Sequence, residues 1–459
     1  MFRHSIISLV LASMVGCASS SDIDYAQKAN KRSEQYLTEL IEQTSQGEDE
    51  LTNEYLDATL LTDLVDIPEL KPYLDSALAN SPSLQQSIIA LQIAYAQQGI
   101  TKADQLPELS AGFDGEASKD SDDAYSADVT VSWELDIWQK LADSSAAAAK
   151  DIAATQAQLQ ATKDLLAANI IRAWLEISVD QQLLNIEKNR LKILENNETL
   201  VLERYQVGLG SLEELDNAKT STASTRATVA QYQENVAQGE RYLTLLTGQW
   251  ESNSTKPQVA LEFPQVLNPL DSMSQQTMSG RPDLQQAFFN IEAESLRTDA
   301  AYKAMLPTFS LAASLTDLAQ TPSEALFTDP LWSVLGSISA PLFQGGSLKS
   351  QAEVAQLTTE QSYWSYQETL LQAVNEVENA LGQETALEQQ QDHLNEALES
   401  AHRSIDSYEE KYRQGLVDIL DLLTVQQQAY DLQAQLASTT YQRLINRVDL
   451  GLALGLGVE

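Results

Sequence analysis

The chain has 459 residues and a formal net charge of −38, because 66 acidic residues outnumber 28 Lys and Arg. This charge argues against nucleic-acid binding, which needs a basic surface to meet the phosphates. A single cysteine excludes an internal disulfide and any zinc site built on paired thiolates. No apolar run reaches the roughly 18 residues of a membrane helix, so a polytopic helical membrane protein is excluded.

The first residues are typical of a lipoprotein signal. Arg3 precedes a short apolar run, which is the order of a secretory signal peptide. Residues 14–17, Met-Val-Gly-Cys, resemble the lipobox of bacterial lipoproteins, although Met replaces the more usual Leu. We therefore expect residues 1–16 to be removed and Cys17 to carry a covalent lipid. Ala18 after the cysteine suggests passage to the outer membrane. Ordinary cleavage, with Cys17 incidental, is the alternative.

The rest of the chain is a duplicated unit that follows an acidic extension at residues 17–66, which includes an expected loop at 43–49. The sequence SPSLQQ at 81–86 recurs as RPDLQQ at 281–286, Leu-Pro at 106–107 recurs at 306–307, and RYQVGL at 204–209 corresponds to KYRQGL at 411–416. An ordered series of this kind indicates internal duplication. We place the first repeat at 67–250, a linker at 251–270 and the second repeat at 271–459.

Each repeat begins with a predicted helix, at residues 84–103 and 284–304. Both stretches are rich in Gln, Ala and aliphatic residues and contain no proline. Pro107 and Pro307 follow, and each stops its helix because proline lacks the backbone donor and restricts the preceding residue.

A pair of predicted strands comes next in each repeat. From 125 to 137 apolar residues occupy every odd position and polar residues every even one, which is the pattern of a strand with one apolar face. Its partner begins at Leu109, across a polar loop expected at 119–123. In the second repeat the strands are expected at 309–316 and 334–342. A half-buried strand of a soluble sheet fits this pattern, and so does a transmembrane strand with aromatic ends.

Very long helices are predicted after the strands, at residues 142–206 and 348–414. Neither stretch contains proline, and each would extend for about 100 Å at 1.5 Å per residue. Apolar spacings of four and three residues suit coiled-coil packing. Gly208 and Gly415 end these helices, and a second helix of about 35 residues follows each, at 212–247 and 419–454.

Four strands are too few for a closed membrane barrel, which needs about eight, and open sheet edges cannot face lipid. The long helices with apolar seams likewise need neighbours. The sequence therefore predicts a ring-shaped oligomer, with a small β-barrel above a long α-helical barrel.

This duplicated order of elements resembles the TolC-like outer-membrane efflux factors, in particular their NodT- and OprM-like lipoprotein branch. The resemblance rests on the lipobox, the Pro-x-Leu helix starts at 82 and 282, and the Leu-Pro stops. It rests also on LDIW at 135–138, PLFQGG at 341–346 and the two Tyr-x-x-Gly-Leu turns.

This resemblance, over roughly residues 60–456, implies an α+β membrane protein that forms a trimer. A twelve-strand barrel would lie in the outer membrane of a Gram-negative bacterium, above a helical tunnel in the periplasm. It implies docking to a periplasmic adaptor (membrane fusion) protein and through it to an inner-membrane transporter of the RND type. The expected function is the exit duct of a tripartite efflux system. No cofactor is implied beyond the lipid on Cys17.

The resemblance places the adaptor contact at the two turns between the long helices. The residues concerned are Val207, Gly208, Leu209, Gly210 and Ser211 in the first repeat, and Gln414, Gly415, Leu416, Val417 and Asp418 in the second. Glycine followed by leucine also simply ends a helix. Both interpretations can hold together, since loops on rigid scaffolds often carry binding residues.

A tunnel gate is the second expected site, formed by Tyr412, Asp418 and Asp421. Asp421 and Tyr412 align with gate residues of the family, although Thr424 stands where a second gate aspartate is usual. Three copies of Asp421 around one axis would form a carboxylate ring that favours cations. Carboxylates at the start of a helix also interact favourably with its dipole, which is the simpler interpretation.

An enzyme has little support in this sequence. There is no Walker A, Gly-x-Ser-x-Gly or His-Glu-x-x-His pattern, and His393 and His402 lack metal-ligand spacing. The competing hypothesis is a periplasmic coiled-coil scaffold or tether lipoprotein without a channel. A tether has no need of amphipathic strand pairs, whereas this chain has two at corresponding places. The sequence leaves open whether drugs, metals or a secreted protein is exported.

Overall fold

The computed structural model describes residues 23–44, 60–64, 67–119, 121–249, 259, 262–264 and 280–458. The chain forms two compact units, and each draws on both sequence repeats. The first holds the described residues up to Ile41 together with Ser87–Leu159 and Pro282–Leu371. The second holds the described residues of Glu42–Gln86, Gln160–Arg281 and Gln372–Glu459. The expected signal peptide and Cys17 lie outside the described residues.

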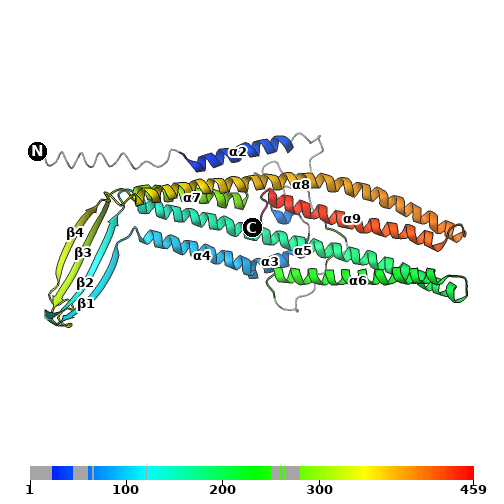
Figure 1. The fold of residues 1–459 in the computed structure, drawn as a ribbon, viewed down its shortest axis with the longest axis horizontal. Coiled ribbons are helices and arrows are strands. Elements are labelled where there is room, and N and C mark those ends of the chain that lie inside the picture. Colours follow the sequence, from blue (N-terminus) through cyan, green and yellow to red (C-terminus); the bar gives the residue numbers. More distant parts are fainter. Residues whose placement is uncertain are drawn as a thin grey trace. The chain divides into compact units, whose positions relative to one another are not determined.

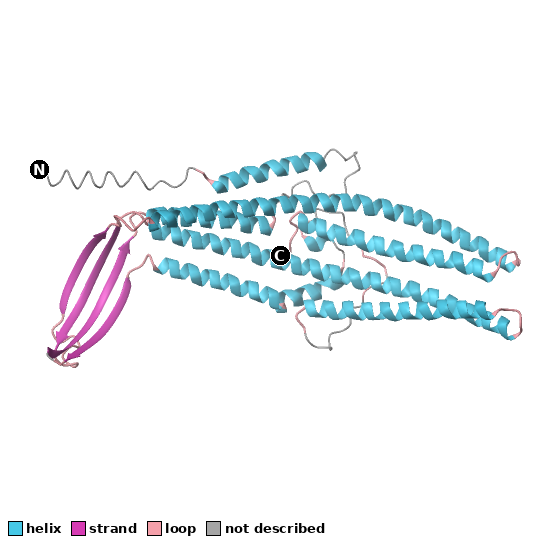
Figure 2. Ribbon diagram, in the orientation of Figure 1, coloured by secondary structure: helices cyan, strands magenta, loops and turns pink. Residues whose placement is uncertain are grey.

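The first unit contains a four-stranded antiparallel sheet in the order β1-β2-β3-β4 (Figure 2). The strands are β1 (Glu108–Ser118), β2 (Ser121–Leu135), β3 (Thr308–Ala319) and β4 (Leu331–Ser339). The two predicted strand pairs are present, and β2 pairs with β3 along eleven residues. This central pairing joins the two sequence repeats in one sheet.

Several strand boundaries differ from the sequence prediction, and β3 continues three residues beyond its expected end at 316. The loop expected at 119–123 is shorter, because Ser118 already pairs with Ser121 and the polar start of β2 belongs to the ladder. Strand β4 begins at Leu331 and ends at Ser339, three residues earlier at each end than expected. Pro330 and Pro341 flank it, and a proline has no N–H to donate to a ladder.

The helices follow the predicted order closely. Helices α4 (Pro82–Ala103) and α7 (Pro282–Lys303) lead into the sheet, while α5 (Lys140–Gln206) and α8 (Ser347–Arg413) lead away from it (Figure 1). Helices α5 and α8 have 67 residues each, and α6 (Leu212–Leu246) and α9 (Ile419–Ala453) have 35 each. At 1.5 Å per residue, α5 and α8 each extend for about 100 Å.

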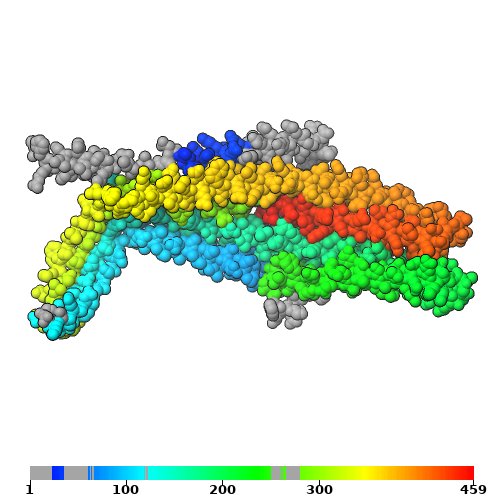
Figure 3. All heavy atoms as spheres, in the orientation of Figure 1, coloured from blue at the N-terminus to red at the C-terminus, as the bar shows by residue number. Residues whose placement is uncertain are grey.

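The second unit is built from helical hairpins, and Figure 3 shows the α5–α6 pair in green alongside the α8–α9 pair in orange and red. Its core includes Ile170, Ile171 and Leu175 of α5 and Leu450 of α9, all almost fully buried. The short elements η3 (Leu61–Leu64), η4 (Pro68–Leu70) and α3 (Lys71–Asn80) also belong to it. Leu60 forms a parallel bridge with Gly457, which joins the segment before η3 to the C-terminal segment after α9.

One helix was not predicted. Helix α2 (Tyr25–Thr44) includes the first residues of the expected loop at 43–49 and contacts α8 in the first unit. The Tyr25 ring lies 5.5 Å from that of Tyr363, and Lys28 Nζ lies 4.6 Å from the Tyr363 ring centroid. Asp24 caps the helix by accepting the N–H of Gln27 at 2.9 Å. The acidic extension therefore contains an ordered, docked element.

Candidate functional site

One face of the sheet is apolar across all four strands. Val131 of β2 pairs with Leu109 of β1 and with Ala313 of β3, and Ala313 pairs with Val334 of β4. Trp332 and Leu109 are largely exposed on this face in the single chain. Apolar positions continue along β2 from Tyr125 to Leu135, which is about 33 Å of strand, or about 25 Å along the membrane normal at a tilt of about 40°. This is the height of the apolar band of outer-membrane barrels.

The opposite face is mainly polar, although Leu318, Leu331 and Leu335 also lie on it. Thr130 of β2 pairs with Ser110 and Ser314, and Ser314 pairs with Ser333. The hydroxyls of Ser314 and Ser333 are 2.7 Å apart. A sheet with one polar and one apolar face suits a wall between water and lipid.

Strands β1 and β4 are the edges of the sheet, and each pairs with only one other described strand. Every residue of β4 is exposed. The outer row of backbone N–H and C=O groups needs partners wherever a sheet edge meets lipid. The chain therefore presents two edges that strands of other copies can complete.

Two of the sequence motifs have a physical role at the junction between helices and strands. The indole N–H of Trp138 donates to the carbonyl oxygen of Pro307 at 2.7 Å, which brings the LDIW motif of one repeat to the Leu-Pro stop of the other. Asp136 accepts the N–H groups of Leu141 at 3.1 Å and Ala142 at 2.8 Å and so caps α5. These motifs fix the direction in which the long helix leaves the sheet.

The two turns between the long helices have the same backbone design. Gly208 has φ +76° and Gly415 has φ +72°, in the left-handed region that favours glycine. Leu209 donates its N–H to Arg204 at 2.8 Å, and Leu416 donates to Lys411 at 2.9 Å. These bonds from the residue after each glycine define the Schellman motif, so the helix-ending role expected of both turns is confirmed.

Both tips expose apolar side chains. Val207 is 70% exposed, Leu209 72% and Leu416 69%. Exposed apolar groups at the end of a rigid hairpin are available for a partner protein. Gly210 and Ser211 complete the first turn, and Gln414 and Val417 lie in the second.

The gate candidates have local structural roles. The Asp421 N–H donates to the Asp418 carboxylate at 3.0 Å, and the Asp418 N–H donates to the Asp421 carboxylate at 3.3 Å. This reciprocal pair is a capping box at the start of α9, and Ser211 and Glu214 form the same arrangement at the start of α6. Tyr412 lies in the last turn of α8, where its carbonyl accepts the Gly415 N–H at 2.9 Å.

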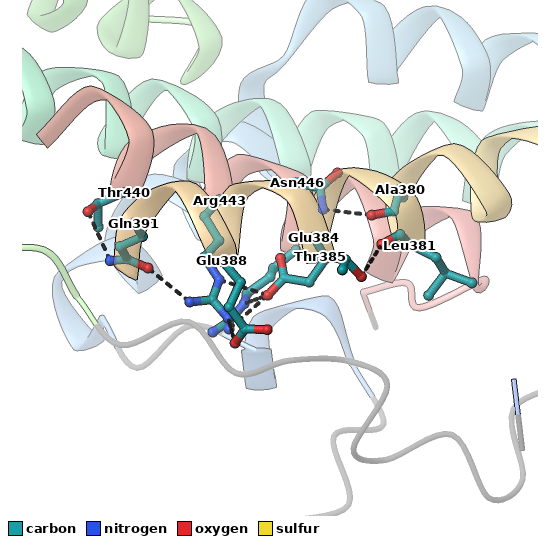
Figure 4. Close-up of polar contacts among 10 residues, drawn as sticks. Ala380, Leu381, Glu384, Thr385, Glu388, Gln391, Thr440, Arg443 and Asn446 are labelled. Atoms are coloured by element: carbon teal, nitrogen blue, oxygen red, sulfur yellow. Dashed lines mark hydrogen bonds and ion pairs between the residues drawn. The ribbon is translucent and has the colours of Figure 1, made fainter. Parts of the chain in front are cut away.

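An ionic network centred on the buried Glu384 joins α8 to α9, and no local sequence pattern indicates it (Figure 4). Glu384 is 5% exposed, and its Oε1 accepts Arg443 Nε and Arg447 Nε, each at 2.9 Å. Arg443 also donates to Glu388 at 2.6 Å and to Gln391 at 2.9 Å. Although burial lowers it, hydrogen bonding and charge from Glu384 and Glu388 raise the pKa of Arg443. The network holds the second hairpin together through charge.

At the corresponding positions of the first repeat, 207 residues earlier, the two helices are joined by a different kind of contact. Ile177 stands in place of Glu384, and Gly239 in place of Asn446, whose side chain donates to the Ala380 carbonyl at 2.9 Å. A Cβ on Gly239 would lie 2.7 Å from Cγ1 of Ile177. The first hairpin thus packs closely through an apolar contact. A position-by-position comparison of the repeats is the signal that could have found this difference.

The side-chain carboxyl group of Asp180 in α5 has a raised pKa. Burial, reinforced by the negative charge of Glu176, raises its pKa to about 6, against an opposing hydrogen bond from Asn235. Burial, with the charges of Glu176 and Asp180, also raises the pKa of Tyr441 to about 12. These groups lie in the helical second unit.

The described residues hold no group of three or more His, Cys, Asp or Glu side chains placed to bind a metal ion. None of the helices in the described part of the chain is long and apolar enough to cross a membrane.

A duplicated chain with an amphipathic, open-edged sheet and paired helical hairpins has the architecture of an outer-membrane efflux channel subunit. The sequence profile described as outer membrane efflux protein matches residues 73–249 and 273–456. The chain belongs to this family, and its resemblance to the TolC-like efflux factors is confirmed.

Two relatives match most of the chain. The probable outer membrane lipoprotein SilC of Salmonella typhimurium is 26% identical over 414 residues, covering 88% of this chain and 89% of its own. The cation efflux system protein CusC of Escherichia coli K12 is 24% identical over 397 residues, covering 85% and 87%.

Solved structures show the same fold. The outer membrane channel CmeC of Campylobacter jejuni superimposes with a TM-score of 0.81 at 21% identity, covering 90% of this chain and 91% of that one. A crystal structure of CusC gives 0.76 at 22% identity, covering 89% and 99%. The predicted fold class, a duplicated unit of helix, strand pair and long helical hairpin, is confirmed.

Proposed function

We propose that the protein is the outer-membrane exit duct of a tripartite efflux system and exports small molecules through a tunnel shared by three chains. The observation that carries this proposal is the four-stranded sheet, which has a lipid-compatible face, a polar face and two open edges. Three copies would supply twelve strands and close the edges of all three sheets. The polar faces would then line the pore.

Exposed apolar side chains on the helices support association with other copies. Ile93 of α4 is 63% exposed, and Val354 and Trp364 of α8 are 63% and 60% exposed. Apolar residues of this size on a periplasmic surface are stabilised by burial against a neighbouring chain. A stable trimer by native mass spectrometry that conducts ions in planar bilayers supports the proposal. A verified trimer without conductance favours the scaffold alternative.

The tips of the helical hairpins are the proposed docking site for a periplasmic adaptor protein, which links the duct to an inner-membrane transporter of the RND type. Leu209 and Leu416 are the exposed apolar groups that such a partner would cover. Leu209→Asp and Leu416→Asp should leave the trimer folded, because both side chains are solvent-exposed, and should abolish adaptor crosslinking. Unchanged crosslinking of both variants would contradict this docking site.

Cys17 is the proposed lipid anchor. The support is the lipobox pattern and the similarity to SilC, which is described as a probable outer membrane lipoprotein. Mass spectrometry of the mature N-terminus should show diacylglyceryl and acyl groups on Cys17. An unmodified cysteine would contradict the anchor.

A cation-selective gate at Asp421, with Tyr412 and Asp418 beside it, is a further part of the proposal. The capping box occupies one oxygen of Asp421 and leaves its negative charge in place at the hairpin tip. Single-channel recording of Asp421→Asn, which keeps a capping acceptor, should show weaker cation selectivity. Unchanged selectivity would assign Asp421 to helix capping alone.

The substrate class stays open within this proposal. Relatives are named for the efflux of cations, antibiotics, toluene and pyoverdine. The described residues hold no metal-ligand cluster that would favour cations. The export profile of a strain that lacks this channel would identify the class.

A further inference from the structure

The two strand pairs have connections of different length at the end of the sheet remote from the helices. Ser118, the last residue of β1, pairs with Ser121, the first residue of β2. Strands β3 and β4 are joined by residues 320–330, a longer segment that contains several turns. Only the second repeat therefore has an extended loop at this rim of the sheet.

This loop is attached to the apolar face of the sheet. Asp317 stands in the apolar row of β3, where it follows Leu315 and pairs with Ala127 of β2. It is 3% exposed, and its Oδ2 accepts the N–H of Asp329 at 3.1 Å. Ala127 is also buried, and Ala325 of the loop is fully buried. The loop thus folds back over β3 on the same side as the apolar row.

The position of Asp317 explains why a cover is needed. It lies eight residues beyond Phe309, which is about 26 Å along the strand and about 20 Å along the membrane normal at a tilt of about 40°. The apolar band of such a sheet is about 25 Å tall, so Asp317 stands within its outer part. A bare carboxylate on the lipid-facing side is unfavourable there. The corresponding residue of the first repeat is Ala117, and that strand pair has no such loop.

The loop carries two large apolar side chains that are exposed beside its polar residues. Leu326 is 63% exposed and Phe327 is 39% exposed. Phe327 has φ +59°, a left-handed conformation that costs roughly 1–2 kcal/mol for a residue with a Cβ. The surrounding loop holds this aromatic residue in a strained conformation, and strain of this kind collects at functional positions.

We propose that residues 321–329 form a lipid-docking loop, in which Leu326 and Phe327 lie among the acyl chains of the outer leaflet while the loop shields Asp317 from them. The partner is the lipid itself, because the loop lies on the face of the sheet that is apolar from β1 to β4. In a trimer the three loops would anchor the rim of the channel at one depth in the membrane. The inference rests on the proposed orientation of the sheet.

The test is quenching of a bimane label by brominated phospholipid in proteoliposomes. The label is attached to Leu326→Cys, with Val334→Cys as the lipid-facing reference and Ser333→Cys as the pore-facing reference. The unsubstituted protein, labelled alongside, corrects for any reaction at Cys17. We expect bromolipid to quench the label at Leu326 as strongly as at Val334, and to spare the label at Ser333.

Quenching at Val334 but not at Leu326 overturns the lipid-docking loop and leaves the orientation of the sheet intact. Absence of quenching at Val334 overturns the orientation and the loop together. In a second variant, Asp317→Ala is combined with Leu326→Cys and should lower the quenching at Leu326, because the loop loses its bond to Asp329. Unchanged quenching there would show that Asp317 does not hold the loop on this face.

Discussion

Removing the Glu384 side chain tests how the second helical hairpin is held together. Glu384→Ala leaves the guanidinium groups of Arg443 and Arg447 without their shared acceptor, at side-chain exposures of only 17% and 18%. Removing one partner of a fully buried ion pair costs about 3–5 kcal/mol. Arg443 keeps Glu388 and Gln391, and both guanidiniums retain some water, so we expect a loss near the lower limit, about 3 kcal/mol.

The assay is guanidinium chloride unfolding of the detergent-solubilised protein, followed by far-ultraviolet circular dichroism. Glu388→Ala is the matched control, because Glu388 also binds Arg443 but its side chain is 54% exposed, and exposed pairs contribute about 1 kcal/mol or less. Replacing Glu384, Arg443 and Arg447 together by Met should restore most of the lost stability, since no unpaired charge stays buried. Equal destabilisation by Glu384→Ala and Glu388→Ala would refute the reasoning.

Three further predictions concern the turns, the helices and α2. Gly415→Ala should destabilise the protein by about 1 kcal/mol, because the residue at this position has a positive φ. Gly382→Ala in α8 should stabilise the protein slightly, because the space around this glycine is open. Equal shifts in the melting temperature of the two variants would contradict this prediction. The raised pKa of Asp180, about 6, means that its ionisation weakens the folded state as pH rises from 4 towards 7. Asp180→Asn should therefore stabilise the protein at pH 7 but not at pH 4, and the gain at pH 7 should be about 1–2 kcal/mol after allowance for solvent screening. If the substitution changed the melting temperature equally at both pH values, ionisation of Asp180 would be excluded as the cause. Tyr363→Ala should expose α2 to trypsin at Lys28 while Tyr363→Phe should not, and equal cleavage of the two variants would show that the ring does not hold α2.

The parts of the fold that the sequence predicts are those with a long regular pattern. Helices α5 and α8 lie within two residues of their expected bounds, because 65 residues without proline and with regular apolar spacing admit few alternatives. The turns at Gly208 and Gly415 could also be predicted, since a glycine followed by a leucine is typical of the end of a helix.

The contacts between segments that are far apart in the sequence could not be predicted from local sequence patterns. Helix α2 was missed because the tyrosine that orders it, Tyr363, lies more than 300 residues away in the chain. The pairing of β2 with β3 and the bond from Trp138 to Pro307 both cross between repeats. Each depends on how the repeats are placed together, which periodicity does not encode.

The sequence predicted where the candidate site lies, but it did not distinguish between the possible roles of its residues. The tips do expose Leu209 and Leu416, as a docking surface requires. Asp418 and Asp421 illustrate the limit, because one carboxylate can cap a helix and also contribute charge to a pore, and the sequence is the same for both roles. Only a measurement on the assembled channel separates them.

The central claim is that the polar face of the sheet lines a pore and the apolar face meets lipid. Its most direct test is single-channel recording of Ser333→Cys and Val334→Cys, neighbours on opposite faces of β4, during treatment with a charged, membrane-impermeant methanethiosulfonate reagent. We predict that modification changes the conductance of Ser333→Cys and leaves that of Val334→Cys unaltered. A change at Val334 with none at Ser333, or no conductance from verified trimers, would contradict the account.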